Sequence, residues 1–160
     1  MDYIQLKKDN IFEIGIKNQE GEDTGDVIRI DLEDLKLPLK CQESEKQIRV
    51  NNQWLQAQRV LIEKRPDKKG KKILSANEEA LIKLVNEYYE RQTKAYELVL
   101  GEGAIKKILC GRNMYITFFM NLEEQMKILR PQLEQKTLNI QDKIKSIAQK
   151  YSQKDSDVME

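Results

Sequence analysis

The spacing of apolar residues changes once along this 160-residue chain, near Pro38. Before Pro38 they recur at every second position, in "IFEIGI" (11–16) and "VIRIDL" (27–32), which is the period of strands with one buried face. After Pro38 they recur at every third or fourth position, which is the period of amphipathic helices. The sequence therefore predicts a small N-terminal sheet packed on helices, because two or three strands need another element across their apolar face.

The N-terminal strands each predict one apolar face. The side chains on these faces are Phe12, Ile14 and Ile16 in the first strand and Ile28, Ile30 and Leu32 in the second. The polar stretch 17–26 between them predicts a hairpin with a long, mobile loop, and "YIQL" (3–6) is a candidate third strand. The predicted fold class is mainly α (α+β), with a small antiparallel β-hairpin or three-stranded sheet packed on a helical bundle.

Two long helices are predicted in the middle of the chain. The first follows Pro38 and ends before Pro66, and its apolar stripe repeats every seven residues, at Cys41, Ile48, Leu55 and Ile62. The second begins after Ser75, because Ser75 and Glu78 have the spacing of a capping box. It keeps its helical spacing of apolar residues as far as Gly101.

The last helical region is predicted from about Asn113 to Tyr151, with Pro131 as a kink or break. Its stripe comprises Leu122, Met126, Leu129, Leu133, Ile140, Ile144, Ile147 and Tyr151. The tail 152–160 has little to bury, so we expect it to be disordered. With the other two regions, helix should account for about 60% of the chain, well above the roughly one third that is usual.

The length of the chain predicts one domain over 1–151, made of a hairpin region (1–36) and a helical region (40–151). The start of the chain does not resemble a signal peptide, and no window approaches the ~20 apolar residues of a membrane span. We therefore expect a cytoplasmic protein.

The composition argues against an enzyme. The chain has no histidine, which removes the commonest general base and the commonest metal ligand. Its two cysteines, Cys41 and Cys110, are too few and too isolated for a disulfide framework or a zinc site. We expect no catalytic residues, no cofactor and no metal.

Three short motifs suggest enzymatic sites and fail for physical reasons. "DTG" (23–25) matches the tripeptide of aspartic proteases, which need two such aspartates in a β-rich body. Gly101-Glu102-Gly103 follows a helix, whereas a phosphate-binding glycine loop follows a strand. Adjacent glutamates at 78–79 and 123–124 point in different directions on a helix. None of the three predicts catalysis.

The glycines in "LVLGEGAIKKILCGR" (98–112) predict two corners around a short helix. Gly101 ends the long helix before it, and Gly111 ends the short helix. Ile105, Ile108 and Leu109 give the short helix one buried face, and Glu102 lies where a helix start favours negative charge.

This order of elements, with "LGEGAIKKIL" followed by Gly111 and Arg112, resembles the small tail assembly chaperones encoded by long-tailed (siphovirus-type) phages and prophages of Gram-positive bacteria. The resemblance covers roughly Phe12 to Tyr151. The matching motif positions are Leu100, Gly101, Glu102, Gly103, Ile108 and Gly111.

The resemblance implies a non-enzymatic role in virion assembly. Members of this class bind the long, helical tape measure protein before the tail tube encloses it, keep it soluble and help to recruit tail tube subunits. The implied partners are thus the tape measure protein and the tail tube protein, in the cytoplasm of the bacterial host. The mature virion does not contain these chaperones, and the resemblance leaves a homo-oligomer open.

Apolar residues at the start of the last helical region are the candidate partner-binding residues. They are Tyr115, Phe118, Phe119, Leu122, Met126, Leu129 and Leu133. Surplus apolar surface on a highly charged chain marks a binding face. The same helical spacing also describes a bundle core, so both interpretations stay open.

The segment from Arg59 to Lys72 carries seven basic and two acidic residues, although the net charge of the chain is only +1. Such a segment attracts nucleic acid, so a nucleic-acid-binding or regulatory phage protein is the alternative function. The run has no interleaved aromatic residue to stack on bases, which favours a solvated loop.

Overall fold

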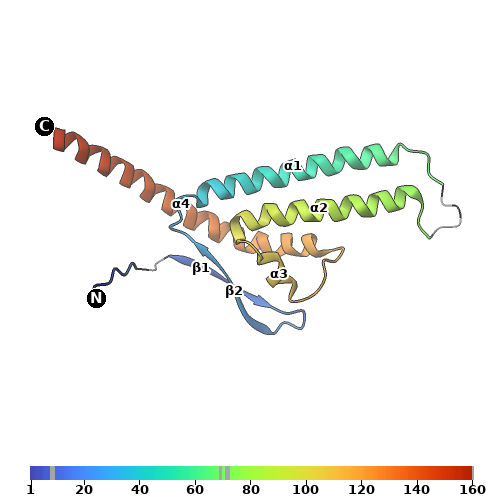
Figure 1. Cartoon of the computed structure of the whole chain (residues 1–160), viewed down its shortest axis with the longest axis horizontal. Coiled ribbons are helices and arrows are strands. Elements are labelled where there is room, and N and C mark those ends of the chain that lie inside the picture. The colour runs from blue at the N-terminus through green and yellow to red at the C-terminus, as the bar shows by residue number, and fades with distance from the viewer. Residues whose placement is uncertain (8–9, 69, 71–72, 160) are drawn as a thin grey trace. The chain divides into compact units, whose positions relative to one another are not determined.

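A computed structural model describes residues 1–7, 10–68, 70 and 73–159. The chain is 64% helical and has a two-stranded antiparallel N-terminal hairpin packed on helices, which confirms the predicted fold class (Figure 1). Its internal contacts divide it into two compact units. One unit is Met1–Leu39 with Lys106–Glu160, and the other is Lys40–Ile105.

The hairpin consists of β1 (Ile11–Lys17) and β2 (Asp23–Asp31). In their register Phe12 lies opposite Ile30, so the apolar side chains of both strands share one face. The buried residues on this face are Phe12, Ile16, Ile28 and Ile30, followed by Leu32 after β2. The predicted strand faces are therefore correct.

The hairpin differs from the sequence prediction in its loop and in its strand number. The predicted loop over 17–26 is shorter in the structure, because β2 already begins at Asp23. The side chain of Asn18 accepts a hydrogen bond from the backbone N–H of Glu22 at 2.9 Å, which closes the turn locally. Residues 3–6 form no strand in the described structure, so only the two-stranded alternative holds.

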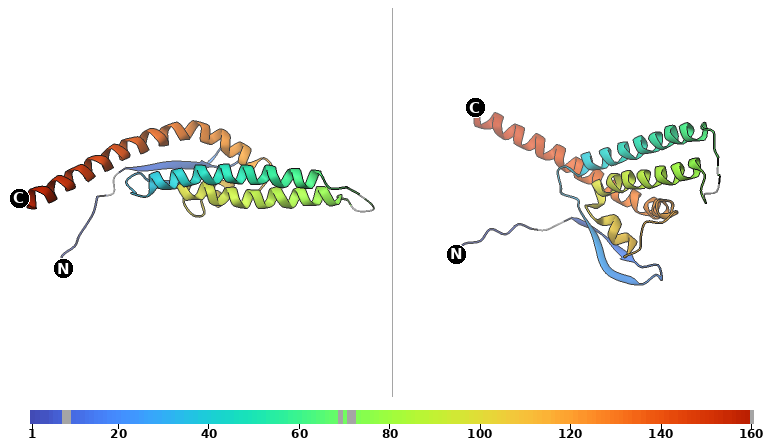
Figure 2. Two further views of the ribbon diagram at one scale, coloured as in Figure 1. Left: turned by 90° about the horizontal axis from the view of Figure 1, so that it is seen from above. Right: turned by 45° about the vertical axis from the view of Figure 1, so that its right-hand side comes forward.

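Helix α4 (Phe118–Met159) belongs to the same unit as the hairpin. It begins after Asn113, where the sequence placed its start, and continues through Pro131 as one bent helix (Figure 2). It also continues to Met159, through residues that the sequence predicted to be disordered. Contact with the hairpin is direct, since the Lys136 ammonium lies 5.0 Å from the centre of the Phe12 ring.

The second unit contains most of α1 (Leu37–Glu63) and all of α2 (Ala76–Leu100). Pro38 lies in the first turn of α1, where a missing N–H group costs no hydrogen bond. The Ser75 hydroxyl accepts from the backbone N–H of Glu78 at 3.1 Å, so the predicted cap of α2 is confirmed.

A polar seam joins α1 and α2, where the sequence predicted an apolar stripe. The Asn51 amide donates to Gln92 Oε1 at 2.8 Å, and the Ser44 hydroxyl donates to the carbonyl of Ala95 at 2.7 Å. These three polar side chains are buried, whereas Cys41, Ile48 and Leu55 of the predicted stripe are only partly buried. The seam fixes the register of the two helices, because a shift along either one would leave buried polar groups unpaired.

Helix α3 (Ala104–Leu109) lies between two glycine corners, as predicted. Gly101 ends α2 with φ 97° and ψ 156°, a backbone conformation that is essentially restricted to glycine. Gly103 and Gly111 also have positive φ, at 80° each. The carboxylate at the start of α3 comes from Glu97, whose Oε1 accepts from the backbone N–H of Ile105 at 3.3 Å, and no such bond involves Glu102 in the described structure.

Replacement of Gly101 by alanine should destabilise the fold through the backbone alone. A Cβ atom at Gly101 meets nothing within 4 Å, so no steric clash contributes. We expect Gly101→Ala to lower the free energy of unfolding by about 1–3 kcal/mol in urea titrations. The exposed Lys106→Ala should change it by less than about 0.5 kcal/mol. Equal stability of the two variants would contradict the corner interpretation.

Asn51 and Gln92 of the polar seam should contribute to stability as a pair rather than as two independent polar residues. Asn51→Leu leaves the buried Gln92 amide without its partner, and should lower the free energy of unfolding by about 1–3 kcal/mol. Adding Gln92→Leu should recover most of this loss, because two apolar side chains then face each other. A double-mutant cycle in urea measures the coupling, and additive effects would contradict it.

Candidate partner-binding site

An aromatic cluster of Tyr115, Phe118 and Phe119 lies at the start of α4. The rings of Tyr115 and Phe118 meet edge to face at 5.5 Å between centroids, and Phe118 meets Phe119 in the same way at 5.0 Å. The guanidinium of Arg112 lies 3.9 Å from the centre of the Tyr115 ring, and the Asn121 amide donates to the Tyr115 hydroxyl at 3.3 Å. These contacts hold Tyr115, which precedes the helix, against its first turn.

A shallow groove of about 260 Å³ lies beside this cluster, within the hairpin unit. Its lining residues are Ile108, Tyr115, Phe118, Asn121, Leu122, Glu124 and Gln125. The groove thus brings together three of the seven predicted partner-binding residues and one residue of the glycine-bounded motif, Ile108. Its mixed apolar and polar lining suits part of a protein side-chain surface better than a charged small molecule.

The seven predicted partner-binding residues are divided between core and surface. Five of the seven are buried, namely Phe118, Phe119, Leu122, Met126 and Leu133. Tyr115 and Leu129 are partly exposed. Burial favours the core interpretation for the five, and leaves Tyr115 and Leu129 as the accessible members of the set. Of the remaining motif positions, Leu100 is buried at the end of α2.

Several exposed apolar residues were missed by the sequence analysis. Ile116 is 86% exposed and Ile128 is 65% exposed, and Met120 and Leu138 are exposed as well. Ile116 precedes α4, and the other three lie off the apolar stripe of this helix, so a search for helical periodicity passes over them. Single exposed apolar residues are common on protein surfaces and by themselves indicate no function.

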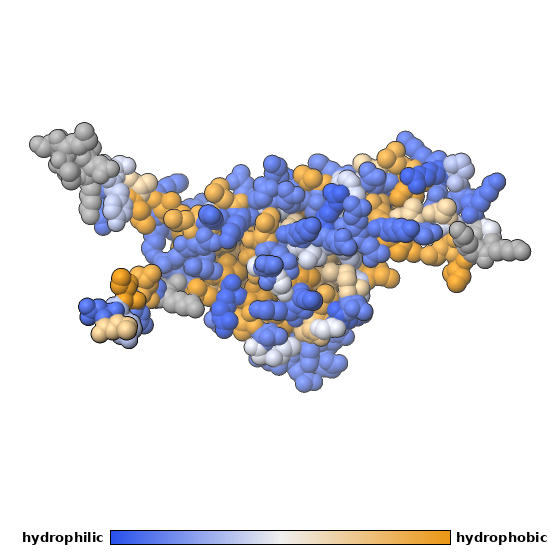
Figure 3. All heavy atoms as spheres, viewed as in Figure 1, coloured by the Kyte–Doolittle hydropathy of each residue, from blue (hydrophilic) through white to orange (hydrophobic). Residues whose placement is uncertain are grey.

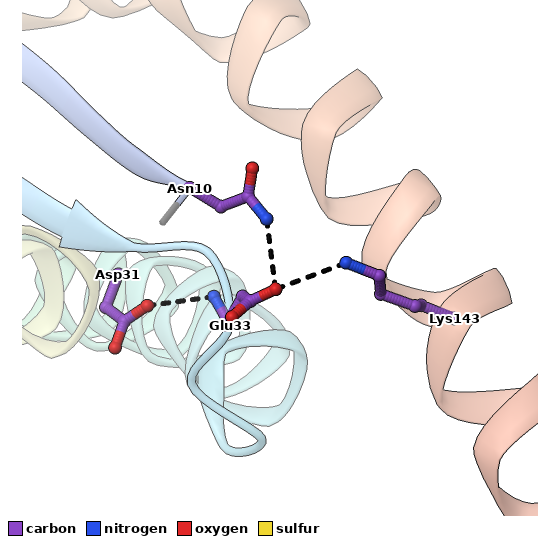
Figure 4. A network of polar contacts seen from close by, with 4 residues as sticks. All are labelled: Asn10, Asp31, Glu33 and Lys143. Atoms are coloured by element: carbon purple, nitrogen blue, oxygen red, sulfur yellow. Dashed lines mark hydrogen bonds and ion pairs between the residues drawn. The ribbon is translucent and has the colours of Figure 1, made fainter. Parts of the chain in front are cut away.

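A polar network ties the end of the hairpin to α4 (Figure 4). One oxygen of Glu33 accepts from the Asn10 amide at 3.0 Å and from the Lys143 ammonium at 3.2 Å. The backbone N–H of Glu33 donates to Asp31 Oδ1 at 2.9 Å. All four residues belong to the hairpin unit, and the sequence analysis identified none of them as interacting.

The network lowers the pKa of the Glu33 carboxyl below its usual value. The hydrogen bond from Asn10 is the largest cause, and the hydrogen bond and charge of Lys143 add to it. Because the pKa is lowered on folding, the ionised carboxylate stabilises the folded state above the pKa of the unfolded chain. This stabilisation is lost as the pH falls through the pKa of the folded state.

The basic segment 59–72 is described only in part. Lys64, Arg65 and Lys68 are exposed, and Arg59 lies 3.7 Å from the Glu63 carboxylate. The remaining basic residues of the segment, Lys69, Lys71 and Lys72, lie outside the described residues. The nucleic-acid alternative therefore stays a prediction from sequence.

We also searched the described residues for metal ligands, for the protease-like tripeptide and for membrane-spanning helices. The described residues contain no group of three or more histidine, cysteine or acidic residues that could hold a metal ion. The "DTG" tripeptide (23–25), which the sequence analysis placed in the hairpin loop, lies in β2. None of the described helices is both long and apolar enough to span a membrane.

The chain was compared with protein families, curated proteins and solved structures. No protein-family model, no curated protein and no solved structure matches the chain. The resemblance to tail assembly chaperones rests on the order of elements and on the motif around Gly101 and Gly111.

Removing the Lys143 charge should raise the pKa of Glu33. In Lys143→Met the carboxylate keeps its bond from Asn10 but loses the nearby ammonium group, so protonation becomes easier. An NMR titration of the Glu33 side chain measures the change. Lys145→Met is the matched control, because it removes the same charge from an exposed site on the same helix. An equal rise in both variants would contradict the network.

Proposed function

We propose that this chain is a non-enzymatic tail assembly chaperone of a long-tailed phage or prophage. In this role it binds the tape measure protein, keeps it soluble and helps to recruit tail tube subunits in the host cytoplasm. The observation that carries the proposal is the order of elements: a hairpin, two long helices, a short helix between glycine corners, and a long final helix.

The surface of the hairpin unit is compatible with a protein client. The groove at the start of α4 combines the apolar Ile108 and Phe118 with polar side chains, and partly exposed Tyr115 lies at it. Tyrosine is enriched at protein interfaces because it combines a large apolar ring with a hydrogen-bonding hydroxyl. Recognition of a helical client would use such apolar contacts.

Co-expression with the tape measure protein of the same phage tests the proposal. We expect the tape measure protein to change from insoluble to soluble and to co-purify with this chain. Because apolar contacts dominate, the complex should persist when the salt concentration is raised. Tyr115→Ala should reduce the yield of complex, while Thr117→Ala, an exposed neighbour, should leave it unchanged.

Two outcomes would contradict the proposal. A tape measure protein that stays insoluble and does not co-purify would remove its basis. Tight binding to DNA that weakens steeply with salt would instead support the nucleic-acid alternative through the segment 59–72.

A further inference from the structure

The apolar stripe of α4 continues beyond Lys143, the last residue of this helix with a described contact to the hairpin region. Ile140 is buried, but the next members of the stripe become progressively exposed. Ile144 is partly buried, Ile147 is 48% exposed and Tyr151 is 57% exposed. Figure 3 shows apolar residues at the surface of this C-terminal part of α4. Their spacing of four, three and four residues is that of a coiled-coil seam.

A row of lysines follows one side of this seam. Lys136, Lys143 and Lys150 are seven residues apart. Lys143 and Lys150 directly precede the seam residues Ile144 and Tyr151. Lys136 precedes the buried Thr137, which continues the seam spacing towards the N-terminus. In a heptad these lysines occupy the flanking position that contacts the neighbouring helix. Along the exposed part of the stripe the opposite flank carries Gln141 and Ala148, which have no charge, and Glu134 lies one heptad earlier on that flank. The face is therefore apolar in the middle and basic along one edge.

The hairpin already shows what kind of surface this face accepts. It buries apolar side chains against the same unit, and it places the Glu33 carboxylate 3.2 Å from Lys143. Lys143 is the second lysine of the row, and the seam residues beyond it are those that become exposed. A partner that continued this interface would supply apolar side chains for Ile147 and a carboxylate for Lys150.

A second copy of the same face fits poorly. Flanking charges set partner choice and orientation between paired helices. In an antiparallel pair the two lysine rows would lie together and repel, and in a parallel pair Lys143 would meet the uncharged Ala148 of the other copy. The seam is spaced for a helix, and from Ile140 to Tyr151 it spans about 17 Å at 1.5 Å per residue.

We propose that this exposed face of α4, formed by Ile144, Ile147, Tyr151 and the lysine row, binds an amphipathic client helix that carries an acidic row beside its apolar seam. The inference rests on the proposed chaperone function, because it adds to the groove beside Tyr115 a second docking face for the client and specifies the charge pattern that this face requires. It places this docking face outside the residues 115–133 that the sequence pattern suggested.

Two synthetic peptides test the charge pattern with the full-length protein. Both contain about three heptads with leucine at the seam positions, and they differ only in carrying glutamate or lysine at the flanking positions. Like charges keep each peptide from pairing with itself. Fluorescence anisotropy should show binding of the glutamate peptide that is at least severalfold tighter than binding of the lysine peptide.

Matched variants distinguish binding at the exposed face of α4 from a general effect of the protein's charge. Lys150→Glu should weaken binding of the glutamate peptide by about three- to fivefold and strengthen binding of the lysine peptide. Lys145→Glu makes the same change on the other side of the helix, and should alter either affinity by less than about twofold. Ile147→Gln should weaken binding of the glutamate peptide by about tenfold. Circular dichroism checks that each variant keeps its helix content.

Several outcomes would overturn the inference. These are equal binding of the two peptides, equal effects of Lys150→Glu and Lys145→Glu, and self-association in sedimentation that Ile147→Gln abolishes, which would assign the face to a second copy. Binding to vesicles of phosphatidylglycerol and phosphatidylcholine, without discrimination between the peptides, would assign it to a membrane surface.

The peptide experiment and the co-expression experiment fail separately. Charge-dependent peptide binding by a chain that does not solubilise the tape measure protein would keep this docking face and remove the proposed function. A solubilised tape measure protein without charge-dependent peptide binding would keep the function and remove this face.

Discussion

The apolar face of the two-stranded hairpin has to be covered, because a hairpin alone is at best marginally stable in water. Helix α4 belongs to the same unit and contacts the hairpin near the open end of its two strands. Lys136 lies over the Phe12 ring, and Lys143 pairs with Glu33. Along α4 the buried stripe residues extend as far as Ile140, and beyond Lys143 the stripe residues Ile147 and Tyr151 are exposed and available to a partner.

Much of this fold follows from short-range sequence patterns. The strand faces, the Ser75 cap and the end of α2 at Gly101 each depend on residues a few positions apart. The two errors in the hairpin prediction also come from relying on short-range patterns. The hairpin loop is shorter than predicted because the Asn18 side chain completes a tight turn, and "YIQL" (3–6) has strand-like composition but no partner strand in the described structure.

The polar contacts could not be predicted, because they join residues far apart in sequence. Asn51 meets Gln92 across 41 positions, and Lys143 meets Glu33 across 110. Each of these residues taken alone is typical of a solvated surface. The sequence contains one signal for the contact between α1 and α2. Leu37, Ser44 and Asn51 are seven residues apart, so Ser44 and Asn51 continue along α1 a row that begins with a buried leucine.

For the candidate site, helical periodicity in the sequence cannot distinguish core residues from interface residues. Core and interface residues share the same helical spacing, so Met126 and Ile147 look alike in sequence although one is buried and the other is exposed. What separates them is their tertiary environment, which is a property of the fold. A stripe that extends past its cover exposes apolar surface, and the lysine row beside it limits both self-association and aggregation by like-charge repulsion. The same charges then restrict the partners that can cover the stripe to those with acidic flanks, so solubility and specificity have one physical origin here.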